Sequence, residues 1–295
     1  MKASHGRFIM KNKREGNKKL QSAMEYLMTY GWAILIIAVV LGALYQLGIF
    51  NSYTFTAKAP PGACQVMRPH GPYTTSFLSL AGACNGEIPE YVGTFSGSSY
   101  MKSIMPINLS SGGSIFAWIY YQGGSGNPTI VGSSGNTPVE LLISGNVLAA
   151  RIYQGGTATL ITSSSVVPMN RWVFVGLTFN ATGMALYINK TEVYTNSLAY
   201  SGQAYTPQLG WDSNSGTDFY AGKMSNVQIY NVSLQNSMVL SLYQEGIGYV
   251  PSNLKNLVVW WQLDGNANDS SGNNNNGQPN GIAFQGSWYR NYTAP

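Results

Sequence analysis

Short runs of apolar residues alternate with turn-forming Gly, Asn, Ser and Pro over most of the chain, from about residue 91 onward. This pattern is typical of short β-strands joined by tight turns. The runs are SIFAWIYY (114–121), PVELLIS (138–144), NVLAARIYQ (146–154), ATLITSSSVV (158–167), RWVFVGLTFN (171–180), GMALYINKTEVY (183–194) and DFYAGKMSNVQIYNVSL (218–234). Their spacing predicts a β-sandwich.

Local residues refine this prediction at a few places. The segments SGN (144–146) and NATG (180–183) contain residues that tolerate positive φ, so each predicts a hairpin connection. Both alternating sets are largely apolar in 171–180, which predicts a central strand covered on both faces. A short helix is predicted over 234–246, capped by Ser233 and packed through Met238, Leu240, Leu242 and Tyr243.

A different pattern precedes these strands. Residues 26–50 contain no charged side chain, and a helix of that length can cross the hydrocarbon core of a membrane. A cleavable secretory signal has a shorter apolar region and a small-residue cleavage site, which this segment lacks. The sequence predicts a basic cytoplasmic leader (1–20), a transmembrane helix (21–50), a linker (51–90) and a sandwich (91–295).

Charge agrees with this topology. Seven basic residues and one acidic residue give residues 1–20 a net charge of +6, whereas nine basic and ten acidic residues give 21–295 a net charge of −1. The positive-inside rule places the N-terminus in the cytoplasm and the sandwich outside the cell. An outer domain without excess positive charge gives no support to nucleic-acid binding.

The predicted linker is rich in Pro and Gly and contains both cysteines, Cys64 and Cys84. In an oxidising compartment these cysteines are expected to form a disulfide that contributes about 3 kcal/mol. The alternative is two unlinked thiols in a reducing interior.

The segment KKLQSAMEYLMTYGWAILIIAVVL resembles the class III, type IV pilin-like signal of archaeal surface proteins. In that family a peptidase cuts before a Gln that matches Gln21, and the Glu at the fifth mature position matches Glu25. Leu20 departs from the Gly usual before the cut. The resemblance implies self-assembly through the helix, with Glu25 paired to the new N-terminus; alternatively, Glu25 lies in the headgroup layer.

Residues 91–248 resemble the laminin-G-like, concanavalin A-like jelly-roll family through FSGSSYM, SIFAWIYY, NRWVFVGLTFNATGMALYINKTEVY and AGKMSNVQIYNVSLQNSMVLSLY. The resemblance implies an all-β jelly roll that binds glycans or proteins, often with calcium at a loop rim. The later segment LVVWWQLDGNANDSSGNNNNGQ (257–278) resembles the opening strand and turn of the family. Residues 257–290 are expected to fold back into the same sandwich. The alternatives are that they start a truncated repeat or donate a strand to a neighbouring subunit.

Catalytic chemistry is not expected in the sandwich. A glycosidase needs two nearby carboxylates, and no two acids between 91 and 295 have the i, i+2 spacing that places both on one strand face. Both histidines lie upstream of residue 91, and neither G-x-S-x-G nor H-E-x-x-H occurs. No catalytic residue, cofactor or metal centre is therefore expected, although Asp264 and Asp269 lie in a loop that superficially resembles a calcium loop without the later Glu.

Ligand binding is the expected activity, since aromatic rings stack on sugars and short polar side chains hydrogen-bond hydroxyl groups. The candidates are Tyr120, Tyr121, Tyr153, Trp211, Asp212 and Asp218, for each of which core packing or turn formation is the alternative. Six N-x-[ST] sequons mark glycosylation candidates at Asn108, Asn180, Asn189, Asn231, Asn268 and Asn291. The favoured function is a pilin-like or adhesin-type surface protein; the alternatives are a solitary membrane-anchored lectin and an atypical glycoside hydrolase.

Overall fold

A computed structural model describes residues 25–26, 28–44, 46, 65–67, 79–81, 89–124, 126–134, 139–154, 157–200, 204–213, 216–248, 250–286, 288 and 292. The chain divides into two compact units, Met1–Lys58 and Ala59–Pro295. Leu20, Gln21, Cys64, Cys84 and Asn291 lie outside the described residues, so the predictions of signal processing and of a disulfide stay predictions.

The described part of the first unit is helical at residues 25–26, 28–44 and 46. Apolar side chains on all sides of this helix are exposed, among them Trp32, Ile36 and Val39. The hydroxyl of Thr29 donates a hydrogen bond to the carbonyl of Glu25, 2.8 Å away. None of the helices in the described part of the chain is both long and apolar enough to cross a membrane.

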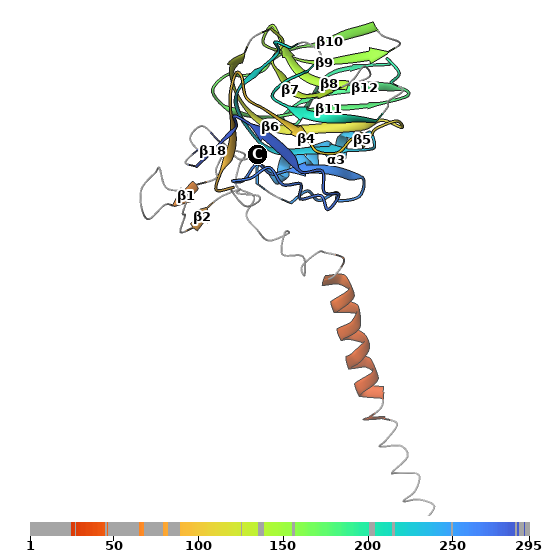
Figure 1. Ribbon diagram of the computed structural model, residues 1–295. Coiled ribbons are helices and arrows are strands. Elements are labelled where there is room, and N and C mark those ends of the chain that lie inside the picture. The colour runs from red at the N-terminus through yellow and green to blue at the C-terminus, as the bar shows by residue number, and fades with distance from the viewer. Residues whose placement is uncertain are drawn as a thin grey trace, which may run out of the picture. The chain divides into compact units, whose positions relative to one another are not determined.

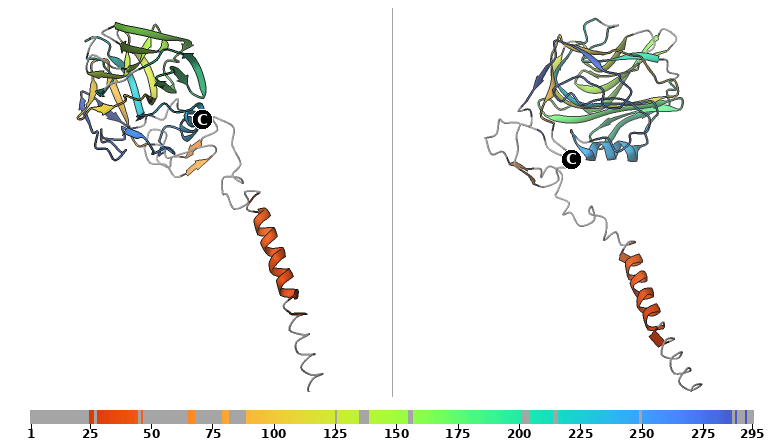
Figure 2. Two further views of the ribbon diagram at one scale, coloured as in Figure 1. Left: turned by 90° about the vertical axis from the view of Figure 1, so that its right-hand side faces the viewer. Right: turned by 60° about the horizontal axis from the view of Figure 1, so that its bottom comes forward.

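Two large antiparallel sheets form most of the described part of the second unit, as Figures 1 and 2 show. Sheet I has the strand order β10 (Thr157–Val166), β9 (Val147–Gln154), β8 (Val139–Ser144), β7 (Thr129–Ser134), β14 (Ala204–Leu209), β4 (Tyr100–Ser103) and β17 (Gly277–Asn280), with β5 (Ile107–Asn108) also paired to β14. Sheet II has the order β13 (Thr191–Asn196), β12 (Gly183–Ile188), β11 (Trp172–Asn180), β6 (Gly113–Gly124), β15 (Tyr220–Tyr230), β3 (Val92–Ser96) and β18 (Ala283–Gln285), with β16 (Leu257–Trp261) also paired to β15. The predicted all-β sandwich is confirmed.

The predicted hairpin at 144–146 sets the register of sheet I. Gly145 and Asn146 have φ values of 55° and 71°, the two successive positive values of a type I′ turn. Ser144 therefore pairs with Val147, and the register continues inward along β8 and β9. The predicted central position of β11 is also confirmed, because β12 and β6 flank it and it is buried from Trp172 to Phe179.

A second core lies on the outer side of sheet II, beneath α3 (Asn236–Glu245). Phe116, Trp118 and Phe174 pack there against Val239 and Leu242 of the helix. The predicted packing face is therefore wrong in part: Leu242 is buried, whereas Met238 and Leu240 are 44% and 37% exposed. The predicted cap is also wrong, because Gln235 occupies the N-cap position and makes no side-chain capping bond.

The C-terminal segment joins both sheets. β16 pairs with β15, β17 pairs with β4, and β18 pairs with β3. Trp261 and Leu263 enter the core between the sheets. Of the three arrangements considered for 257–290, the structure has the fold-back, in which the last strands lie beside the first ones.

The described residues of the predicted linker include a strand pair that its Pro- and Gly-rich pattern did not indicate. The short strands β1 (Gln65–Met67) and β2 (Ser79–Ala81) pair antiparallel within it, with Gln65 opposite Ala81. Each strand has only three residues, too few for an alternating pattern to be recognised in the sequence.

Candidate functional site

The outer face of sheet I carries polar and aromatic side chains. On β8, Val139, Leu141 and Ile143 point into the core between the sheets, as do Leu148, Ala150 and Ile152 on β9. Because side chains alternate along a strand, Glu140, Arg151 and Tyr153 point to the opposite, outer face.

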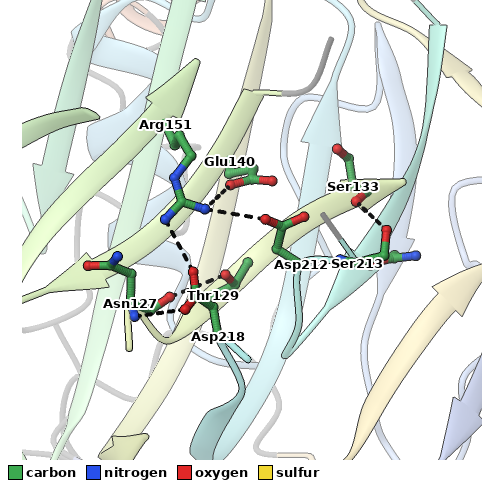
Figure 3. Close-up of polar contacts among 9 residues, drawn as sticks. Asn127, Thr129, Ser133, Glu140, Arg151, Asp212, Ser213 and Asp218 are labelled. Atoms are coloured by element: carbon green, nitrogen blue, oxygen red, sulfur yellow. Dashed lines mark hydrogen bonds and ion pairs between the residues drawn. The ribbon is translucent and has the colours of Figure 1, made fainter. Parts of the chain in front are cut away.

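Three acidic residues converge on Arg151 on this face (Figure 3). One guanidinium nitrogen, Nη1, lies 3.0 Å from Oε2 of Glu140 and 3.3 Å from Oδ2 of Asp212. The other, Nη2, lies 3.2 Å from Oδ2 of Asp218. Glu140 and Asp212 are fully buried, and the side chain of Arg151 is 11% exposed. Arg151 is thus the shared partner of three acidic side chains.

Two aspartates of this cluster come from the loop between β14 and β15. The backbone amide of Asn127 donates to Oδ1 of Asp218 at 3.1 Å, and that of Thr129 donates to the Asp218 carbonyl at 3.1 Å. Beside Asp212, the hydroxyl of Ser213 donates to the Ser133 carbonyl at 3.2 Å. The cluster therefore ties the loop to β7, β8 and β9.

Burial and like charge act together on Glu140. Burial, followed by the Asp212 carboxylate, raises the pKa of Glu140 to about 9, although Arg151 partly opposes the shift. Burial by itself would lower the pKa of Arg151, but the carboxylates of Glu140 and Asp218 outweigh it and the net shift is upward. Glu140 is therefore protonated at neutral pH, and Arg151 stays charged.

A pH dependence of stability follows from Glu140. Between its ordinary pKa and about 9, the folded state holds a proton that the unfolded state releases, so the free energy of unfolding falls as the pH rises through this window. We expect Glu140→Gln to remove this contribution. Urea unfolding at pH 5 and pH 8 measures it: the wild type should lose more stability than the variant over this interval, and parallel losses would contradict the assignment.

Aromatic rings lie on the same face. The ring of Trp211 stacks on that of Phe219 with centroids 5.6 Å apart, and its centroid lies 4.8 Å from that of Tyr100. Tyr100 points outward because its neighbour Met101 belongs to the core. All three rings are partly exposed, as is Tyr153 next to Arg151. The Nε1 atom of Trp211 is buried and has no hydrogen-bond acceptor among the described residues.

The six predicted ligand-binding residues divide into two groups. The structure brings Tyr153, Trp211, Asp212 and Asp218 together on this face. Asp212 and Asp218 are buried, so they hold the loop rather than present an open carboxylate.

The other two lie in sheet II. Tyr121 is only 4% exposed and belongs to the core between the sheets, so its prediction as a ligand contact is wrong. Tyr120 is partly buried; it packs against Trp172, and Lys223 Nζ lies 5.4 Å from its ring centroid.

Sequence reasoning missed Glu140 and Arg151. The search for acids with i, i+2 spacing covered only pairs on one strand, whereas these acidic side chains come from β8 and from a distant loop. A signal was present: the type I′ turn at 145–146 fixes Glu140 directly opposite Arg151.

The two calcium candidates have separate surroundings. Asp269 accepts hydrogen bonds from the backbone amides of Trp260, Ser271 and Asn275 and from the Ser271 hydroxyl, so it organises its own loop. Asp264 accepts the amide of Tyr91 and lines a polar cleft of about 110 Å³ with Pro89, Ser225, Asn226, Ile247, Gly248 and Gln262. In the described part of the chain, no three His, Cys, Asp or Glu side chains are grouped closely enough to hold a metal ion.

The sequons that the structure describes lie at turns and strand ends. Asn108 and Asn268 are exposed, and Asn180, Asn189 and Asn231 are partly buried. The Oδ1 atom of Asn180 accepts hydrogen bonds from the amides of Thr182 and Gly183, and that of Asn189 accepts the amide of Phe174.

Comparison with known families identifies the domain type. Residues 95–239 match the family described as the concanavalin A-like lectin/glucanases superfamily (Laminin_G_3). The match begins in β3 and ends within α3, so it leaves out β16, β17 and β18. This part of the chain is thus a concanavalin A-like domain. A search among curated proteins found no match.

One solved structure supports the fold. A candidate carbohydrate-binding protein from Bacteroides ovatus ATCC 8483 has a TM-score of 0.53 and 20% sequence identity over 67% of this chain. The match covers 60% of the length of that protein. A SAP-like pentraxin from Limulus polyphemus has a TM-score of 0.44 and 13% identity, with 53% of this chain and 83% of the pentraxin covered.

Proposed function

We propose that the concanavalin A-like domain of this chain binds carbohydrate on the outer face of sheet I. The observation that carries the proposal is the pairing of partly exposed rings, Tyr100, Tyr153 and Trp211, with a buried ionic cluster that holds the loop bearing Trp211. The domain type and the similar Bacteroides ovatus protein support a carbohydrate ligand in preference to a protein ligand.

The chemistry of the face suits sugars. Rings of Tyr and Trp cover the apolar face of a pyranose, and neighbouring polar groups hydrogen-bond its hydroxyls. A loop fixed in advance loses little conformational entropy when a ligand binds. Arg151 and its carboxylates have this positioning role, and the rings make the contact.

A glycan array of neutral and acidic oligosaccharides tests the proposal on the full chain in detergent. For a glycan that binds, we expect Tyr153→Ala to weaken binding at least about tenfold, a change of about 1.4 kcal/mol. Tyr120→Ala is the matched control, because Tyr120 is also a partly buried tyrosine but lies in sheet II. Equal losses in the two variants, or an array without any bound glycan, would contradict the proposal.

We propose binding without hydrolysis. The meeting of Glu140 with Asp212 favours the glycoside hydrolase alternative, since such enzymes use a pair of carboxyl groups. Both side chains, however, are fully buried and bound to Arg151. The glycosidic oxygen of a sugar on this face would therefore not reach the carboxyl group of Glu140 or of Asp212. Release of reducing sugar from a bound glycan that Glu140→Gln abolishes would establish the hydrolase instead.

We further propose that the domain is displayed outside the cell by a membrane-embedded N-terminal helix in a pilin-like manner. Support comes from the uncharged sequence 26–50, the basic residues before it and the exposed apolar side chains of helical residues 28–44. N-terminal sequencing of the native protein should give Gln21 as the first residue. An intact N-terminus without filaments would favour the solitary membrane-anchored lectin.

Glycosylation and calcium belong to the same proposal. An outward-facing domain would expose the sequons, and exposed Asn108 and Asn268 are the best candidates to carry glycans. Intact-mass measurement of native protein counts the occupied sites.

Calcium at Asp264 remains the cofactor candidate, which calorimetric titration with Ca²⁺ tests.

A further inference from the structure

We propose that β10 is a self-association edge, on which a second copy of this chain adds its own β10 antiparallel. In the described part of the chain, the edge strands at the ends of the sheets are β10 and β17 in sheet I, and β13 and β18 in sheet II. β5 and β16 also lack a partner strand on one side, but β5 has only two residues, and Ser270, Asn273 and Asn275 donate hydrogen bonds to carbonyls of β16. Unpaired backbone groups on such edges recruit other strands unless charge, proline, a bulge or short length prevents it.

Three of the four edges have such protection. β17 has four residues and contains Pro279. β18 has three residues. β13 carries Glu192, and its pairing with β12 shifts register between Leu186 and Tyr187.

The fourth edge, β10, lacks it over most of its length. Its ten residues, TATLITSSSV, include no charge, no proline and no glycine. The pairing with β9 is regular from Thr157 to Thr162, and the register shifts only beyond Thr162. Four consecutive residues, 157–160, are exposed, and Leu160 is 45% exposed. Six residues of regular and uncharged edge, all exposed except Ile161, are thus available for pairing.

The second copy is the partner that fits this edge. An antiparallel pair related by a two-fold axis is self-complementary, and Thr and β-branched residues form favourable cross-strand pairs without opposing like charges. Residues 21–295 have a net charge of only −1, so two outer domains repel each other little. None of the six sequons falls between residues 157 and 170, so glycans attached at these sites would not be linked to the edge.

This pairing has a geometric consequence that rests on the proposed function. The two-fold axis of antiparallel strands is perpendicular to the sheet, so the outer faces of both copies of sheet I point the same way. Two glycan sites on one side would increase binding to a surface that carries repeated glycans.

Amide hydrogen exchange of the full chain in detergent tests the pairing locally, independently of any association through the N-terminal helix. We expect the β10 amides that point away from β9 to exchange at least about tenfold more slowly in concentrated samples than after dilution with empty micelles. Thr162→Lys, which puts two like charges at the shared edge, should abolish this protection. Thr195→Lys is the matched control, because Thr195 is also an exposed threonine on an edge strand, in sheet II.

The β10 amides that point toward β9 should stay protected in every variant, which verifies that the domain is folded. If Thr162→Lys fails this check, Leu160→Lys replaces it. Outward β10 amides that exchange as fast in the concentrated wild type as in the lysine variant would overturn the proposal. Protection that persists after dilution would also overturn it, because the pairing strand would then not come from a second copy. Neither outcome bears on the glycan array, so this inference and the proposed function fail separately.

Discussion

Arg151→Met should reduce the free energy of unfolding by about 3–5 kcal/mol, the usual cost of removing one partner of a buried ion pair. The substitution keeps an unbranched side chain, although a shorter one, and removes its charge. The carboxylates of Asp212 and Asp218 would then lie in the protein interior without the guanidinium that now faces them at 3.3 and 3.2 Å. Urea denaturation at neutral pH measures the loss.

Two further variants separate the effect of the lost charge on stability from the effect of the lost packing. Arg171→Met removes an exposed arginine and should change stability by no more than about 0.5 kcal/mol. Adding Asp212→Asn and Asp218→Asn to Arg151→Met should recover part of the loss, because the uncompensated charges are then gone. If the combined variant is less stable than Arg151→Met, the cluster does not act through its charges.

A chain truncated after Asn256 should lose its cooperative unfolding transition altogether. Truncation removes β16, β17 and β18, which pair with β15, β4 and β3. Replacing the fully buried Trp261 by Ala is by itself expected to cost about 3–5 kcal/mol, and a whole domain is stable by only about 5–15 kcal/mol. Loss of three strands therefore exceeds the available stability.

Differential scanning calorimetry of the full-length and truncated chains in detergent provides the measurement. Adding residues 257–295 as a separate peptide should restore part of the transition, since the missing strands pair at the ends of the sheets. A truncated chain that melts at the wild-type temperature would show that the C-terminal segment is dispensable for the fold.

Strands and turns were predictable from the sequence where residues close together in the chain determine the local structure. The apolar runs at 114–121 and 171–180 became β6 and β11, and the Gly145-Asn146 turn set the β8–β9 register. In contrast, β14 was not expected, since it contains Pro207 and lies between two other strands of sheet I. Pro207 is accommodated because β5 pairs with residues 204–205 and β4 with residues 208–209, leaving residue 207 unpaired on that side.

The candidate site shows the same limit. Tyr153, Trp211, Asp212 and Asp218 could be chosen from residue type, but residue type alone does not distinguish an exposed ring from a core ring, and Tyr121 was misassigned for that reason. Exposure depends on which strand covers which face, a property that no local window of sequence contains.

The sequence alone determined four features: the β class of the domain, its hairpins, the separation of a basic N-terminal region from a nearly neutral outer part, and the uncharged segment 26–50. Each of these features depends only on residues that are neighbours along the chain. The tertiary structure alone decided that β17 and β18 lie beside β4 and β3, and that Glu140, Asp212 and Asp218 meet at Arg151. Sheet pairing and a shared counter-charge join residues up to about 190 positions apart, and such long-range contacts form only when the whole sandwich closes.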